Sequence, residues 1–284
     1  MRVRTTADEI VAATRTDHSA VTTDATPNAM QMFTNRTLQA EARRQYEQNR
    51  TGPYTLSGGN SGAFIPLSAM TNNTSSIIAA LAAQSPATFL PDSTHPTILE
   101  GYAQQLKVMK DLLSSDKAAV FEYPIGAGAM VAFLKPLSRG TVNINPANAI
   151  AAPLVNYRTF TNPLDLTLTV HGIKMFRRLY STPSAKTLGP VERSPGEAVQ
   201  TDDEWVAFLK RSMSPSFYHP VGTASLGPKS GGGVVGSDLK VHGIEGLRVV
   251  DASIMPLIPG THTSSSVYAV AEKAADLIIN VGKA

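Results

Sequence analysis

The last quarter of the chain, from Tyr218 to Ile279, constrains the fold more than any other part. It ends in an apolar stripe with the i, i+3, i+4 spacing of an amphipathic helix, formed by Val267, Val270, Ala271, Ala274, Leu277 and Ile278. Ser264 and Ser265 are suitable N-caps for this helix, and Gly282 could end it. The stripe must pack against something, so we expect a folded domain around it.

Two histidines stand on either side of the Gly-rich part of this quarter. His219 lies within residues 217–223, and His262 comes just before the predicted helix. An imidazole exchanges a proton near neutral pH, and a helix N-terminus stabilises a nearby negative charge. We therefore predict that His219 and His262 form a proton-transfer pair beside a developing negative charge.

Composition excludes several classes of function. The chain has 284 residues, of which 42% are hydrophobic and 17% charged, as in an ordinary globular protein. Its formal net charge is +3, and no run of Lys and Arg occurs, so we expect no nucleic-acid partner. The absence of cysteine excludes disulfides, thiolate metal sites and a cysteine nucleophile.

Other patterns also give negative or open answers. No apolar run is long enough to span a bilayer, and no histidine spacing indicates a metal site. Localisation stays open: the N-terminus has no signal-peptide core, although sequons at Asn35, Asn49, Asn72 and Asn73 hint at a secreted ancestry. Glycines at 126–131 begin like a dinucleotide fingerprint, but Val131 takes the third glycine position, so we predict a link between two strands.

The remaining periodicities predict a mixture of helices and strands. Helices are expected over 38–49, 75–84, 97–113 and 163–180, and after a capping box formed by Thr201 and Glu204. Strands are expected within 118–137 and over 141–145, and a loop over 56–63. Because these elements show no strict βαβ alternation, the predicted fold class is α+β.

The C-terminal quarter resembles the glucose-methanol-choline (GMC) oxidoreductases, which are FAD-dependent alcohol oxidases and dehydrogenases. From Glu204 to Ile279 the blocks match in order and spacing: 218–223, 233–235, 239–243, 247–253, Pro256, Pro259, His262 and 267–278. A weaker resemblance lies upstream, at 52–53, 138–140, 163–165 and 195–196.

This resemblance implies FAD-dependent oxidation of an alcohol (a CH–OH donor), with a small-molecule alcohol as substrate. It makes His219 the catalytic base and His262 its partner across the flavin. By resemblance only, Asp251, Ala252, Thr263 and Ser264 would contact the cofactor.

The resemblance also implies a division of the chain. Residues 1–55 would be a linker or FAD-domain remnant, 56–215 a substrate-binding domain with an antiparallel sheet flanked by helices, and 216–284 a catalytic segment. That last segment would contribute the C-terminal strand and helix of an incomplete FAD-binding α/β domain. The family's Gly-x-Gly-x-x-Gly turn is absent from these 284 residues, so we expect a C-terminal portion that retains FAD poorly by itself.

Two alternatives stay open at this point. Two histidines serve equally as acid and base, so a non-redox lyase or cyclase on the same scaffold is one alternative. The other is non-enzymatic: an inactive remnant, or a subunit that binds a partner chain supplying the missing FAD-binding half.

Overall fold

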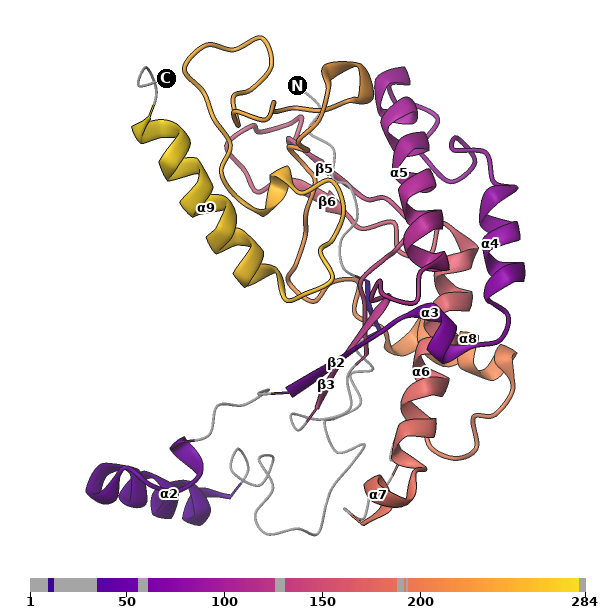
Figure 1. Cartoon of the computed structure of the whole chain (residues 1–284), viewed down its shortest axis with the longest axis vertical. Helices are drawn as coiled ribbons and strands as arrows, with labels where there is room; N and C mark the ends of the chain where they lie inside the picture. Colours follow the sequence, from indigo (N-terminus) through magenta and orange to yellow (C-terminus); the bar gives the residue numbers. More distant parts are fainter. Residues whose placement is uncertain are drawn as a thin grey trace.

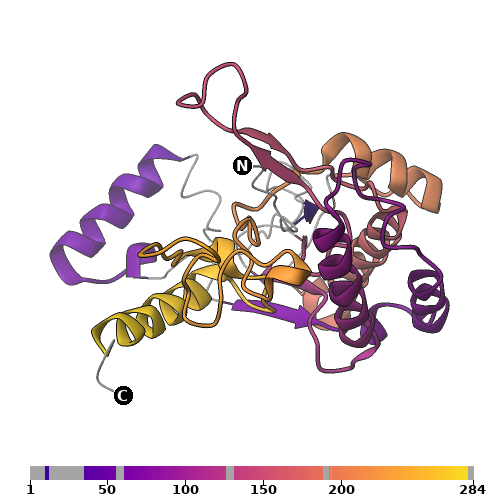
Figure 2. The same ribbon diagram turned by 90° about the horizontal axis from the view of Figure 1, so that it is seen from above.

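A small antiparallel sheet lies at the centre of the computed structural model, which describes residues 10–12, 35–55, 61–125, 131–187, 192 and 194–280. The sheet has the order β1-β4-β3-β2 and is formed by β1 (Ile10–Ala12), β2 (Ser61–Ile65), β3 (Phe121–Ile125) and β4 (Val131–Phe133). A separate hairpin pairs β5 (Thr141–Asn143) with β6 (Leu154–Asn156). The hairpin extends outward from the body of the protein (Figure 2).

Most of the helices gather on one side of this sheet, with the C-terminal helix on the other side (Figures 1 and 2). The helices are α2 (Arg36–Asn49), α3 (Leu67–Met70), α4 (Thr74–Ala82), α5 (Pro96–Ser114), α6 (Pro163–Tyr180), α7 (Pro183–Lys186), α8 (Asp202–Ser212) and α9 (Thr263–Ile279). Three short 3-10 turns are η1 (Pro53–Thr55), η2 (Lys229–Gly231) and η3 (Ala252–Ile254). The predicted α+β class is confirmed.

Local sequence signals place most of these elements correctly. The apolar periodicities correspond to α2, α4, α5, α6 and α9, and the capping box of Thr201 and Glu204 starts α8. The prediction of a loop over 56–63 is wrong for residues 61–63, which belong to β2 because they pair with β3. The glycine segment 126–130 lies outside the described residues, but the antiparallel strands β3 and β4 flank it.

The two faces of β3 point toward different parts of the protein. On one face the Phe121 ring stacks on Phe133 with the centroids 4.8 Å apart, and the Tyr123 hydroxyl donates to the Gly172 carbonyl of α6 at 2.9 Å. Gly172 permits this close approach, because a Cβ there would lie 2.7 Å from the Phe121 ring. Since side chains alternate along a strand, Glu122 points to the other face, away from α6.

A buried carboxylate fixes the turn between β4 and β5. Asp165, in the first turn of α6, accepts hydrogen bonds from the backbone N–H groups of Leu137 and Ser138, each at 2.7 Å. Burial outweighs these contacts and raises the pKa of Asp165 from 3.8 to about 6. The helix and the chain entering the hairpin are thereby joined at one point.

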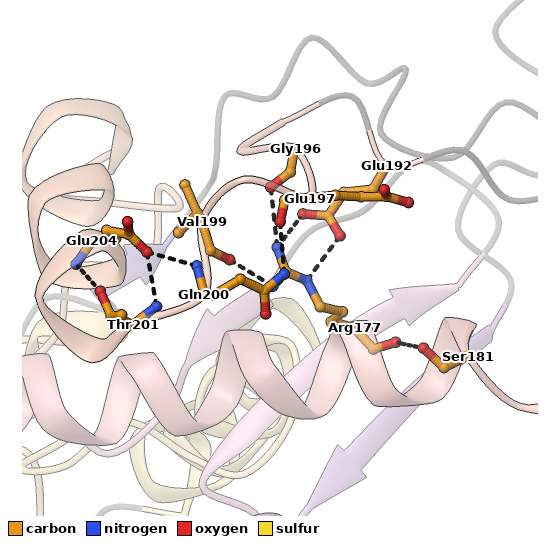
Figure 3. A network of polar contacts seen from close by, with 9 residues as sticks. All are labelled: Arg177, Ser181, Glu192, Gly196, Glu197, Val199, Gln200, Thr201 and Glu204. Atoms are coloured by element: carbon orange, nitrogen blue, oxygen red, sulfur yellow. Dashed lines mark hydrogen bonds and ion pairs between the residues drawn. The ribbon is translucent and has the colours of Figure 1, made fainter.

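Arg177 of α6 organises the segment that leads into α8 (Figure 3). Its guanidinium makes a two-pronged contact with Glu192 at 2.6 and 2.8 Å and donates to the carbonyls of Gly196 and Val199. The same group lies over the Trp205 ring of α8, 4.4 Å from the centroid. A planar fork that meets a carboxylate, two carbonyls and an aromatic face holds this irregular stretch against the helices.

The chain from Ser214 to His262 is largely irregular and forms a smaller unit beside α9. Val235, Leu239, Val241, Ile254 and Ala274 make up its buried cluster. The C-terminal strand that the resemblance implies corresponds here to isolated bridges, among them the one between Lys240 and Arg248. This unit abuts α5 so closely that a Cβ at Gly101 would lie 2.0 Å from the Gly231 carbonyl oxygen.

We expect Asp165→Asn to destabilise the protein by about 1–3 kcal/mol, because one backbone N–H at 137 or 138 loses its acceptor. The raised pKa means that the native state of the wild type binds a proton which the unfolded state releases, so wild-type stability rises as the pH falls through about 6. The variant lacks this titration. Its deficit in unfolding free energy, measured by urea denaturation, should therefore be larger at about pH 5 than at about pH 7.5. Asp116→Asn, at an exposed position, is the control and should show neither effect.

Candidate functional site

The side chains of His219 and His262 meet in the structure, as the sequence predicts. Their ring centroids are 5.2 Å apart with an interplanar angle of 74°. The Phe217 ring lies edge-on to both, 5.5 Å from His219 and 6.0 Å from His262. His219 is half-buried, whereas 53% of the His262 side chain is exposed, so both rings are within reach of a ligand.

A buried apolar cluster sets the spacing of the two histidines. It contains Val221, two residues after His219, and Ile258, four residues before His262, together with Met255. Val267 and Val270 of α9 pack against the same cluster. Two segments that are far apart in sequence are therefore held by one set of apolar contacts.

The helix start differs from the prediction. Thr263 is the first residue of α9 and His262 is its N-cap, so the predicted N-caps Ser264 and Ser265 already lie inside the helix. The His262 side chain makes no capping hydrogen bond, and its carbonyl accepts from the Ser265 hydroxyl at 3.1 Å. The first turn of this 17-residue helix thus follows directly after His262, whose side chain does not cap it, and a helix N-terminus is a favourable position for negative charge.

Glu122 is a residue of the candidate site that sequence reasoning missed. Its carboxylate contacts Nδ1 of His262 at 2.8 Å through Oε1 and at 3.0 Å through Oε2. Only 4% of the Glu122 side chain is exposed, so a buried charge on the sheet orients an exposed ring on the α9 side. The available signal was an acidic residue in the middle of an apolar strand, since buried carboxylates are rare unless paired.

The residues predicted to contact a cofactor lie on η3 and on the start of α9, which pack together. Asp251 is exposed, and its carboxylate accepts from the backbone N–H of Ser253 at 2.8 Å. Ala252 is half-buried against the cluster of Val221. Thr263 is buried and Ser264 is exposed at the first turn of α9.

Backbone hydrogen bonds connect this region to the chain after His219. Ala224 N–H donates to the Ser253 carbonyl at 2.9 Å, and Leu226 N–H donates to the Ile254 carbonyl at 2.8 Å. The chain that carries His219 and the predicted cofactor segment therefore run side by side.

A separate cavity of about 860 Å³ opens between α5, the β5–β6 hairpin and the irregular unit. Its walls are mostly apolar and include Leu90, Ile98, Ile144, Val234, Leu247 and Val249, with the buried Arg139 among the polar residues. Neither histidine of the pair is part of this lining.

No cluster of His, Asp and Glu among the described residues is suited to hold a metal ion. None of the helices in that part of the chain has the length and apolar character that crossing a membrane requires.

Known proteins are similar to this chain in sequence and in fold. The dehydrogenase xptC of Emericella nidulans is 36% identical over 259 residues, which cover 89% of this chain and 42% of that protein. An FAD-dependent oxidoreductase from Chaetomium thermophilum superposes with a TM-score of 0.89 at 32% identity, over 99% of this chain and 49% of that one. A fungal aryl-alcohol oxidase gives a TM-score of 0.82 at 39% identity, over 93% of this chain and 46% of that one.

The chain therefore spans less than half the length of each of these relatives. Residues 136–271 match the family described as GMC oxidoreductase, and this range contains both histidines and the predicted cofactor residues. Through this C-terminal domain the chain belongs to the GMC oxidoreductase family, whose solved relatives are FAD-dependent enzymes.

Proposed function

We propose that this chain is the substrate-side portion of an FAD-dependent oxidoreductase that oxidises the CH–OH group of a small alcohol. The observation that carries the proposal is the meeting of His219 and His262 at the uncapped start of α9, with Glu122 behind one of the rings. Oxidation of an alcohol removes a proton from oxygen and a hydride from carbon. Bound FAD would accept the hydride, and the residues of this chain manage the proton and the charge.

The two histidines have different surroundings and therefore different roles. With Glu122 as the acceptor, His262 carries a proton on Nδ1, which leaves Nε2 directed away from the carboxylate.

The two rings then divide the work. His219 accepts the hydroxyl proton of the alcohol, and His262, when both of its ring nitrogens carry protons, donates a hydrogen bond from Nε2–H to the oxygen as negative charge develops. Phe217 packs edge-on against both rings and restricts their rotation.

The residues at the start of α9 and in η3 fit a flavin. The uncapped amides of α9 supply partial positive charge beside the histidines, and the exposed Asp251 and Ser264 supply polar groups at the same surface. Ala252 and Thr263 form the backing that a flat ring system would contact.

We also infer that a polypeptide segment outside this chain holds much of the FAD, either as a further part of the protein or as a partner chain. The relatives are more than twice as long as the matched stretch. On this chain, α9 exposes 75% of Tyr268 and 64% of Ile279. An apolar surface of this kind supports a covering partner.

The chain by itself should bind FAD only weakly, because the described residues offer the flavin one helix start and no glycine-rich phosphate turn. After incubation with FAD and gel filtration, the flavin absorbance is expected to separate from the protein. Flavin that elutes with the chain in a one-to-one ratio would show that no further polypeptide is required.

In the FAD-loaded protein, His219→Ala is expected to reduce the rate of flavin reduction by an alcohol roughly 10²–10⁴-fold, because the proton acceptor is lost. The measurement is anaerobic stopped-flow bleaching of the flavin absorbance. His95→Ala, at an exposed histidine outside the site, should keep the wild-type rate. A wild-type rate in His219→Ala would remove this residue from the mechanism, and product without bleaching would support the lyase or cyclase alternative.

Glu122→Gln is expected to slow the same bleaching by roughly 10²-fold, because an amide lacks the negative charge that binds Nδ1–H and orients the His262 ring. The change keeps the size of the side chain, and Glu245→Gln at an exposed position is the matched control. If Glu122→Gln matches the control, the carboxylate has a structural role only.

A further inference from the structure

The segment that leads to His262 lacks backbone support of its own. Among the described residues, Pro256–Thr261 makes no backbone–backbone hydrogen bond, and its two prolines have no N–H to donate. Leu257 and Ile258 pack into apolar clusters, which restrain the segment but do not fix its rotation. The polar contacts to this segment therefore decide how His262 is presented.

Among the described residues, the polar contacts to this segment come from side chains on the sheet side of the protein. Gln105 Nε2 of α5 donates to the Pro256 carbonyl at 3.2 Å. Lys135, two residues beyond β4, donates from Nζ to the Ile258 carbonyl at 2.6 Å and to the Leu134 carbonyl at 3.3 Å. Glu122 of β3 then contacts the His262 ring itself.

Lys135 is the most costly of these contacts to build. Only 5% of it is exposed, and a buried ammonium group is unfavourable unless it is well hydrogen-bonded, whereas a methionine would fill similar space without a charge. Its hydrogen bond of 2.6 Å goes to a carbonyl four residues before His262. One contact of this buried charge therefore holds the backbone that leads to His262.

We propose that Lys135 is a positioning residue for His262: by holding the Ile258 carbonyl, it keeps the Nδ1 atom of His262 within hydrogen-bond distance of Glu122. Glu122 lies on β3 and Lys135 lies two residues beyond β4. These two strands are paired, with Glu122 opposite Ala132. Sheet and segment are thus connected at two points, one on the backbone before the histidine and one on its ring. The positioning of His262 is a structural claim, and only its importance for catalysis rests on the proposed function.

The test measures which nitrogen of the His262 ring carries a proton in the chain by itself, so it does not depend on catalytic turnover. In protein with ¹⁵N-labelled histidine, long-range ¹H–¹⁵N spectra report which ring nitrogen carries the proton. The wild type should show a proton on Nδ1 of His262, and Glu122→Leu, which has no acceptor atom, should lose that signal. We expect Lys135→Met to lose it as well, with Glu122 still present.

Controls separate positioning from a general loss of stability. Lys117→Met removes an exposed lysine and should keep the His262 signal. Lys135→Gln removes the buried charge but is too short to hold the Ile258 carbonyl, so it should fold readily and still lose the signal. Where spectra are weak, the rate of modification by diethyl pyrocarbonate is a second readout. His262 should be modified faster in Lys135→Met and Lys135→Gln than in the wild type, with the exposed His95 of the same molecule as the reference.

The proposal is overturned if Lys135→Met or Lys135→Gln has a lower melting temperature but an unchanged His262 signal and modification rate. That outcome would leave the proposed function intact, because the Glu122–His262 contact would persist. Conversely, a wild-type turnover rate in His219→Ala would refute the proposed chemistry without affecting the contact between Lys135 and Ile258.

Discussion

The contact between Glu122 and His262 connects the two sides of this protein. A carboxylate on the middle of a strand is removed from water, which costs free energy unless a partner and hydrogen bonds compensate. Here the partner is an imidazole from the other side of the molecule, at 2.8 Å. The sheet therefore carries the side chain that orients the histidine pair, and the helices behind the sheet support it.

The helices could be predicted from sequence because their signals are local. Apolar spacing and the capping box of Thr201 and Glu204 depend on residues within a few positions of one another, and they place α6, α8 and α9 correctly. Residues 61–63 were mistaken for a loop because glycine and serine are common in loops, whereas their pairing with β3 is a long-range fact.

The site could be predicted only in part, for the same reason. The meeting of His219 and His262 was expected from the family resemblance together with the chemistry of imidazole. The contribution of Glu122 was not, because it is separated from His262 by 140 positions and no periodicity connects the two. The roles of Asp251, Ala252, Thr263 and Ser264 remain predictions, and the structure shows that they lie on η3 and the first turn of α9.

The missing side chain at Gly172 matters beyond the packing of α6. Tyr123 and Phe121 press against the helix there, and Glu122 stands between them on the reverse side of the same strand. A methyl group on the helix would press on Phe121 and so on the strand that carries Glu122. The size of the residue at position 172 thus bears on the His262 ring, which it does not touch, through the thickness of one strand.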